Sequence, residues 1–178
     1  MVKDLKLAIS GHKGVGKTTA AKYLASKHGF RIESFAGKLK SLSSKFYPFN
    51  DLHLNGNLKE EKFEGHDWTP RDFMIKLGAF MRYWEPDYWI NSINISKGSV
   101  VIDDLRYLNE VEYLKSKGFK TIRINRFDKH NPYKSDLNDP SETQLDNYEF
   151  DYVIHDISNI TLNDLYASLE HILGKLNE

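Results

Sequence analysis

Apolar segments alternate along the chain with segments of helical periodicity. The first apolar segment, Leu5 to Ile9, predicts a buried strand. Apolar residues at helical spacing follow over Thr18 to His28, and Gly29 supplies a stop for that helix. The last helix is the clearest, because its large apolar residues form one stripe: Leu162, Leu165, Leu169, Ile172 and Leu173.

Further strands and one more helix complete this alternation. Thr161 and Asp164 predict a capping box before the last helix, and Gly174 predicts its end. A helix is also expected over Asn109 to Lys117, closed by Gly118. The remaining strands are predicted at Arg31–Ser34, Val100–Ile102, Lys120–Arg126 and Tyr152–His155. Strands separated by helices build parallel sheets, so the pattern predicts an α/β fold with helices on both faces of the sheet.

Two long segments interrupt the alternation. Ser41 to Ile95 begins with a turn-rich stretch, Asn50 to Asp67, and then holds at least one helix. Phe127 to Pro140 is a polar segment with two prolines. Loops of this length inside a compact domain are usually functional. The chain has no repeats and no linker-like break, so residues 1–178 are expected to form one domain.

The amino-acid composition excludes several classes of function. The 178 residues carry 25 basic and 25 acidic side chains, a balance that argues against a nucleic-acid binder. There is no cysteine, which excludes disulfides and thiolate chemistry. No apolar run approaches ~18 residues and no secretory signal is visible, so we expect a cytoplasmic protein (host cytoplasm if viral) with no membrane partner.

The residues from Gly11 to Thr18 fit the pattern G-x-x-x-x-G-K-[ST] between a buried strand and a helix. Such a loop curls its backbone N–H groups around a phosphate at a positive helix N-terminus. We expect Lys17 to bridge the β- and γ-phosphates of ATP and Thr18 to hold Mg²⁺. The residues expected at the triphosphate are Gly11, Lys13, Gly14, Val15, Gly16, Lys17, Thr18 and Thr19.

Several positions near this loop stay open to two interpretations. Lys13 is either a cation near the triphosphate or a solvated loop lysine, and Thr19 either contacts the α-phosphate or caps the helix. Asp103 and Asp104 follow a buried strand, where a P-loop protein needs an acid for magnesium. Adjacent strand residues point to opposite faces, so at most one of the two is expected to face the metal.

Arginines indicate what receives the phosphate. Thr69, Pro70 and Asp72 predict a helix start, and Arg71 in that first turn adds a cation where the helix is already positive. Arg82 lies near the same face if the helix continues through Gly78. Tyr83, Trp84, Tyr88 and Trp89 follow, and they indicate either a stacked base beside a bound phosphate or an aromatic satellite core.

These features together resemble the phage-type deoxynucleoside monophosphate kinases, a branch of the P-loop nucleoside monophosphate kinases. The matching pieces span nearly the whole chain in order: Gly11–Thr18, Ser34–Lys40, Lys59-Glu60, Thr69–Arg71, Leu77-Gly78 with Arg82, Asp87–Trp89, Asp104–Arg106 with Asn109-Glu110, Ile124–Arg126 and Ser141-Glu142. The resemblance implies an adenylate-kinase-like, five-stranded parallel sheet of order 2-3-1-4-5. It also implies that residues 41–95 are a substrate-binding arm and residues 127–140 a short lid.

The resemblance also implies residue roles. It favours Asp104 over Asp103 at the metal, and it places Arg106 and Arg126 around the transferring phosphoryl group together with Lys17 and Arg82. The residues that it implies for the acceptor are Lys40, Arg71, Arg82 and Trp89. Glu110 is expected either to orient Arg106 or to stabilise the first turn of a helix. The chain departs from the family at Asp156 and in its lid lysines, so no adenine contacts are assigned.

The expected activity is therefore ATP- and Mg²⁺-dependent phosphorylation of a deoxynucleoside monophosphate, by a monomer or a homodimer. The indole of Trp89 is expected to wall the acceptor site against a ribose hydroxyl. One alternative is a kinase with a hydroxyl acceptor, for which Glu33 is the candidate base unless it is only an outward strand residue. The other alternative is a non-catalytic, nucleotide-dependent switch.

Overall fold

The protein is described from a computed structural model over residues 4–95, 98–125, 140–155 and 161–178. Arg126, Asp156 and all of the expected lid except Pro140 lie outside these residues. Among the described residues, no helix combines the length and the apolar character that a membrane crossing requires.

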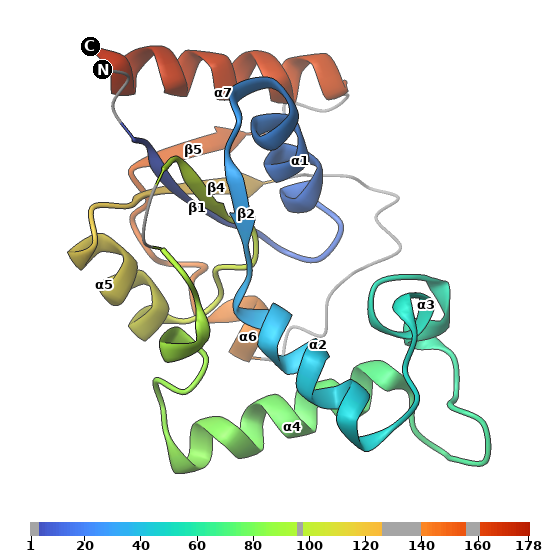
Figure 1. Cartoon of the computed structure of the whole chain (residues 1–178). Coiled ribbons are helices and arrows are strands. Elements are labelled where there is room, and N and C mark those ends of the chain that lie inside the picture. The colour runs from blue at the N-terminus through green and yellow to red at the C-terminus, as the bar shows by residue number, and fades with distance from the viewer. Residues whose placement is uncertain (1–3, 96–97, 126–139, 156–160) are drawn as a thin grey trace. The chain divides into compact units, whose positions relative to one another are not determined.

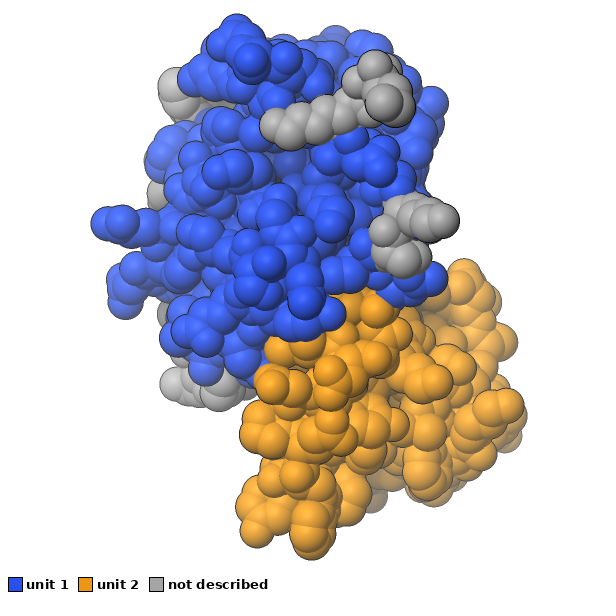
Figure 2. All heavy atoms as spheres, turned by 60° about the vertical axis from the view of Figure 1, so that its left-hand side comes forward, with its two compact units in different colours: residues 1–33, 94–178 blue, residues 34–93 orange. Residues whose placement is uncertain are grey.

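The chain divides into two compact units, coloured separately in Figure 2. Unit 1 comprises Met1–Glu33 and Asn94–Glu178, and unit 2 comprises Ser34–Ile93. Unit 2 overlaps most of residues 41–95, the expected substrate-binding arm, but begins at Ser34 and ends at Ile93. The earlier start follows from helix α2 (Phe35–Phe46), which the sequence interpretation did not include and which packs against helix α4 (Pro70–Trp84).

Unit 1 is built on a five-stranded parallel sheet. Its strands are β1 (Lys6–Ser10), β2 (Arg31–Glu33), β3 (Val100–Ile102), β4 (Lys120–Asn125) and β5 (Tyr152–His155). Their order is β2-β3-β1-β4-β5, which confirms the predicted order. Ala8 at the middle of β1 lies opposite Ile102 of β3 and Thr121 of β4. The carboxyl ends of β1 and β3 therefore meet at one edge of the sheet, where open α/β folds bind ligands.

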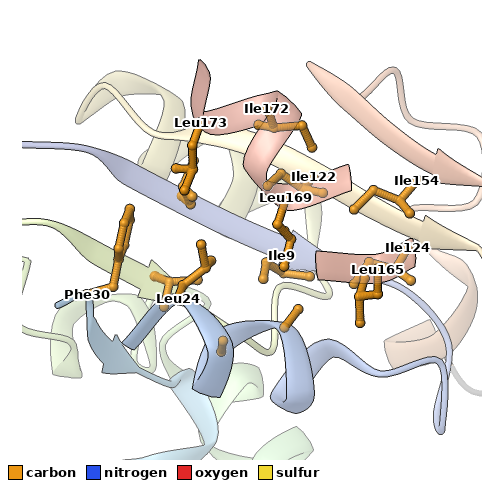
Figure 3. Close-up of a cluster of buried hydrophobic side chains, with 14 of the residues drawn as sticks. Ile9, Leu24, Phe30, Ile122, Ile124, Ile154, Leu165, Leu169, Ile172 and Leu173 are labelled. Carbon is orange, nitrogen blue, oxygen red and sulfur yellow. The ribbon is translucent and has the colours of Figure 1, made fainter. Parts of the chain in front are cut away.

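Helices cover both faces of this sheet, as the alternation predicts. The helices are α1 (Lys17–His28), α5 (Leu108–Ser116), the short α6 (Pro140–Thr143) and α7 (Leu162–Asn177). Figure 1 shows α5 on the opposite side of the sheet from α7. The core under α1 and α7 is apolar and fully buried, and Figure 3 shows the stripe of α7 lying over the strands: Leu165, Leu169, Ile172 and Leu173 against Ile9, Ile122, Ile124 and Ile154.

The ends of two helices test the local signals. Gly29 has φ 69° and ends α1, because glycine adopts this left-handed conformation without steric cost. Thr161 and Asp164 form the predicted capping box of α7, with the Thr161 N–H donating to Asp164 Oδ2 at 2.8 Å. The prediction that Gly174 ends α7 is wrong. The helix continues to Asn177, because Leu176 in its last turn still packs against the core.

Unit 2 consists of helices and turns. It contains α2, α3 (Asp51–Leu54), α4 and the 3₁₀ turns η1 (Asn57–Glu60) and η2 (Ile90–Ser92). Aromatic rings from its loops and helices pack together: Tyr47, Phe49, Phe63, His66, Trp68 and Phe73. Tyr83 and Trp84, in contrast, are 81% and 71% exposed.

Candidate nucleotide-binding site

The P-loop connects β1 to α1 in a conformation that requires its glycines. Gly11, Gly14 and Gly16 have φ values of 149°, 83° and 104°. A Cβ on Gly11 would lie 2.5 Å from the carbonyl oxygen of Ile124, so the loop begins in direct contact with the backbone of β4. These glycines allow the loop to turn back over the sheet edge and aim its N–H groups inward.

Lys17 places a positive charge inside this loop. Its Nζ donates to the carbonyl oxygens of Gly11 at 2.6 Å and His12 at 2.8 Å, and the residue is 9% exposed. The pKa of the Lys17 ammonium is lowered to about 8, chiefly by burial and also by the nearby charge of Arg106, while nearby acids oppose the shift. The charge therefore lies at the position where the motif predicts the phosphates.

Thr18 and Asp103 form the candidate magnesium position. The Thr18 hydroxyl donates to Asp103 Oδ2 at 2.9 Å, which joins the first turn of α1 to the end of β3. Asp104, which the sequence interpretation favoured, exerts its charge on Lys17, as Asp103 also does, and on Arg106. The contact with Thr18 favours Asp103 for the metal, while Asp104 stays the prediction of the resemblance. Adjacent side chains along an extended strand point in different directions, and it is Asp103 that accepts the hydrogen bond from Thr18.

These two side chains offer hydroxyl and carboxylate oxygens, which are the donors that Mg²⁺ prefers. Within the described ranges, no group of three histidine or acidic side chains could hold a metal ion by itself. Mg²⁺ at such a site commonly takes its remaining ligands from water and from the phosphates of a nucleotide. The donor set at Thr18 and Asp103 thus fits magnesium bound together with a nucleotide.

Arg106 lies just after β3 and is held from two sides. Its Nη1 donates to the carbonyl oxygen of Ser141 at 2.9 Å and to Glu142 Oε1 at 2.5 Å. Its backbone N–H donates to Glu110 Oε2 at 2.9 Å, and the same oxygen accepts from the N–H of Tyr107. Glu110 therefore caps the start of α5, which was one of the two roles that the sequence left open for it.

Glu142 belongs to the matching piece Ser141-Glu142, for which the sequence analysis gave no role. Its side chain is only 1% exposed, and its Oε2 accepts from the backbone N–H of Lys13 at 3.0 Å. Burial by itself raises the pKa of a carboxyl group, but the ion pair with Arg106 and the hydrogen bond from Lys13 lower the pKa of Glu142 below its ordinary value. Glu142 is therefore a buried, ionised acid that joins Arg106 to the P-loop.

A second ionic group beside the loop was missed by the sequence reasoning. Asp146 Oδ1 lies 3.1 Å from Nε2 of His12 and 2.5 Å from Nη2 of Arg123, and Arg123 also donates to the Ser10 hydroxyl at 3.2 Å. Arg123 is 6% exposed in the middle of β4. A charged residue between the apolar Ile122 and Ile124 was the signal that could have identified it, since buried charges are paired.

A pocket of about 230 Å³ opens beside the P-loop within unit 1. It is lined by the loop, the ends of β4 and β5 and the first turns of α7: Gly14, Val15, Gly16, Thr19, Ile124, Asn125, Ile154, Thr161, Leu162 and Leu165. Its lining is mostly apolar with a few polar groups, which is typical of small-molecule sites.

Unit 2 carries the residues expected to bind the acceptor. The predicted helix does continue through Gly78, so Arg71 and Arg82 both lie on α4. Eleven residues return a helix to nearly the same face and advance it by ~16 Å. Arg71 Nη1 is 3.6 Å from Glu60 Oε1, and Lys40 Nζ donates to Asn55 Oδ1 at 2.7 Å.

Trp89 has a different place from the one expected. It is 2% exposed, and its indole N–H donates to the carbonyl oxygen of Gly78 at 3.3 Å. An indole this deeply buried presents almost no surface to a substrate, so the assignment of Trp89 to the wall of the acceptor site is corrected. Its contact with Gly78 joins the segment after α4 to the helix itself.

Comparisons with known proteins identify a family model and a viral relative that match this chain. A family model described as an AAA domain matches residues 7–131. A protein of Acanthamoeba polyphaga mimivirus, named "Putative deoxynucleotide monophosphate kinase", is 27% identical over 188 residues, with 92% of this chain and 93% of that protein covered. This relative confirms the resemblance that the sequence motifs indicated.

Two solved structures are similar to the chain at low identity. Shikimate kinase from Bacteroides thetaiotaomicron is 11% identical with a TM-score of 0.49, and 99% of this chain and 100% of that chain are covered. A gluconokinase from Sinorhizobium meliloti 1021 is 12% identical with a TM-score of 0.45, over 97% of this chain and 95% of that chain. The match to the family model, together with the P-loop and the sheet order, shows that the chain belongs to the AAA-domain family of P-loop proteins.

Proposed function

We propose that this P-loop protein is a kinase that transfers the γ-phosphoryl group of ATP to the 5′-phosphate of a deoxynucleoside monophosphate, giving a diphosphate and ADP. The observation that carries the proposal is the grouping at one edge of the sheet. This edge carries three features: the buried ammonium of Lys17, the hydrogen-bonded pair of Thr18 and Asp103, and the guanidinium of Arg106. Phosphoryl transfer depends on such positioning and charge neutralisation.

The residues of this edge have separable roles. Lys17 exchanges its carbonyl contacts for oxygens of the β- and γ-phosphates, while Thr18 and Asp103 supply the oxygens for magnesium. A bound magnesium ion would neutralise part of the phosphate charge. Arg106 adds a fixed positive charge for the phosphoryl group in transfer. The acceptor phosphate is already an anionic nucleophile, so the mechanism requires no general base.

The pocket beside the P-loop suits the nucleoside part of ATP. Val15, Ile124 and Leu165 give it apolar walls, and the loop that binds the phosphates forms one side of it. A purine binds by apolar contact on its faces and by hydrogen bonds at its edge. We therefore assign this pocket to the adenosine of ATP rather than to the acceptor.

Arg71 and Arg82 are proposed to bind the acceptor. Arg71 lies in the first turn of α4, where the partial charge of the helix is already positive, and this arrangement favours an anionic ligand. The ~16 Å between the two positions along the axis means that both could reach one phosphate only if their side chains lean toward each other. Lys40 remains a predicted ligand of the acceptor, and Arg126 a predicted cation at the transferring phosphoryl group. The choice of a deoxynucleotide follows the name of the mimivirus relative.

The hydroxyl-acceptor alternative requires a base on β2. Glu33, the only candidate that the sequence offered, is ion-paired with Arg31, whose guanidinium also donates to the carbonyl oxygen of Asn94 at 2.8 Å. The carboxylate of Glu33 is thus engaged by a guanidinium of its own strand. This contact favours a phosphate acceptor over a hydroxyl acceptor.

A coupled assay of ADP release tests the proposal. The acceptors are the four deoxynucleoside monophosphates, their ribonucleotide counterparts and the unphosphorylated deoxynucleosides, with Lys17→Ala as the inactive control. We expect release of ADP to depend on a deoxynucleoside monophosphate. Equal rates with ribonucleotides would make the protein a general nucleoside monophosphate kinase, and activity only with unphosphorylated nucleosides would overturn the proposal.

A further inference from the structure

We propose that Glu142 is a positioning residue whose buried carboxylate fixes Arg106 and the first turn of the P-loop in the geometry that phosphate binding requires. The proposal rests on the function proposed above, because it concerns how that site is held before substrates arrive. Glu142 itself is not expected to contact a substrate.

Each oxygen of this carboxylate has a different partner. Oε1 accepts from the Arg106 guanidinium at 2.5 Å, and Oε2 accepts from the N–H of Lys13 at 3.0 Å. The side chain is 1% exposed, so both contacts are shielded from water. Hydrogen bonds to an ionised group in such surroundings are stronger than neutral ones and are more demanding in geometry. One side chain thus sets the distance between an arginine after β3 and a backbone amide of the P-loop.

A second acid continues the same contact surface. Asp146 follows Glu142 by four residues and binds His12, the residue that precedes Lys13 in the loop. Arg123 of β4 anchors Asp146 in turn. Between the two acids, Leu145 is 2% exposed, and this burial holds the segment in place. The segment 142–146 therefore contacts the P-loop at two consecutive residues.

The negative charge of Glu142 also offsets the repulsion between two nearby cations. Arg106 and Lys17 are both cationic and close enough for the guanidinium to influence the ammonium. Glu142 lies near both and opposes their repulsion. Without its charge, Arg106 would lose its ion pair and the two cations would move apart. The side chains that the proposed transfer uses would then no longer be aligned before the nucleotide binds.

A purely structural acid elsewhere in unit 1 provides the matched control. Asp151 accepts from the backbone N–H of Thr121 at 2.9 Å and from its hydroxyl at 2.7 Å. This contact joins the beginnings of β4 and β5, at the opposite end of the strands from the P-loop. Asp151→Asn therefore removes the charge of a carboxylate that accepts two hydrogen bonds, and it leaves the candidate nucleotide-binding site unchanged.

The experiment compares Glu142→Gln and Asp151→Asn in the full chain. Gln keeps an oxygen for the Lys13 N–H but loses the ion pair with Arg106. We expect Glu142→Gln to lower kcat by about 10²-fold, the order of effect that a misplaced group near the chemistry produces. The KM for the acceptor should change much less than kcat. Glu142→Asp, which is too short to reach both partners, should give an intermediate loss.

Two readouts do not depend on turnover. Calorimetric titration with ATP alone should show weaker binding in Glu142→Gln than in Asp151→Asn. Hydrogen exchange followed by NMR should show faster exchange of the Lys13 amide in Glu142→Asp, because the shortened carboxylate no longer holds it. If the protein transfers no phosphate to any monophosphate, the proposed function fails, and these two readouts still test the positioning role.

A double-mutant cycle tests whether Glu142 acts through Arg106. In an Arg106→Met background, Glu142→Gln should add little further loss of kcat, because its partner is already absent. The proposal is overturned if the two losses simply multiply. It is also overturned if Glu142→Gln lowers the melting temperature as Asp151→Asn does while its kcat and ATP affinity stay at wild-type values and Lys13 exchange in Glu142→Asp is unchanged.

Discussion

Replacing Asp103 by Asn should raise the Mg²⁺ concentration that the enzyme needs. The structure places the Asp103 carboxylate 2.9 Å from the Thr18 hydroxyl, so the substitution keeps an acceptor for that hydroxyl and removes only the negative charge. A hydrogen bond to a charged group contributes about 1.5–3 kcal/mol, against about 0.5–1.5 kcal/mol for a neutral one. The attraction between carboxylate and cation is lost as well, and unit charges ~4 Å apart near a protein surface interact by ~4 kcal/mol.

Water between the charges weakens this attraction, so the free energy of Mg²⁺ binding should become less favourable by about 1.5–3 kcal/mol in total. This free energy corresponds to an increase of about tenfold to a hundredfold in the half-saturating Mg²⁺ concentration. The assay measures initial rates at saturating ATP and acceptor while total Mg²⁺ is varied. Melting temperatures with and without Mg²⁺ separate loss of the ion from loss of the fold.

Asp104→Asn is the matched control for this prediction. The charge of Asp104 acts on Lys17 and Arg106, so its removal should lower kcat with a much smaller shift in the Mg²⁺ requirement. If Asp104→Asn raises the Mg²⁺ requirement and Asp103→Asn does not, the assignment of the metal position to Thr18 and Asp103 is refuted.

Three further predictions follow from single side chains. Lys17→Ala should lower the rate by ~10²–10³ with little change in melting temperature, because glycines set the loop, and near-normal turnover would contradict its role. Arg71→Ala and Arg82→Ala should each raise the KM for the monophosphate by about tenfold to a hundredfold and leave that for ATP nearly unchanged, whereas equal effects on both substrates would argue against acceptor binding. Hydrogen bonds from Tyr23, His28 and Lys27 of α1 lower the pKa of Glu170 to about 2. The stability that the ionised Glu170 adds is therefore present above its ordinary pKa, and it is lost as the pH falls from about 5 toward 2. The melting temperatures of wild type and Glu170→Gln should therefore converge over that range, and a constant difference would count against the ionised carboxylate.

Local signals were sufficient to predict the five strands and the helices that alternate with them, while the order of the strands came from the resemblance. The central strands were predictable because β1 and β3 are short apolar runs, and Gly29 and the pair of Thr161 and Asp164 act on their immediate neighbours. Gly174 misled the prediction for a physical reason. A glycine in a helix carries only a modest cost, and the packing of Leu176 offsets it.

The candidate site was only partly predictable, because its connections span long stretches of sequence. Glu142 contacts Arg106 across 36 positions and Lys13 across 129. No periodicity or spacing encodes such contacts, and Glu142 was visible only as part of a matching motif. The choice between Asp103 and Asp104 is difficult for a different reason. It depends on the direction in which the chain leaves β3, which the residue types do not specify.

Trp89 illustrates the limit for aromatic residues. The sequence reasoning weighed a substrate wall against an aromatic core for the stretch from Tyr83 to Trp89. In the structure, Trp89 is buried against Gly78 while Tyr83 and Trp84 are exposed. An indole serves equally well in packing and in binding, so its residue type cannot decide between the two roles.

The fate of the γ-phosphate of ATP tests the central claim most directly. The purified protein is incubated with Mg²⁺, ATP labelled in its γ-phosphate and a deoxynucleoside monophosphate, and the products are identified by phosphorus NMR and mass spectrometry. The account predicts that the label appears in the β-phosphate of the deoxynucleoside diphosphate, with ADP formed in equal amount and no such product from Lys17→Ala. Label found only in inorganic phosphate, or only in a monophosphate made from an added nucleoside, would contradict it.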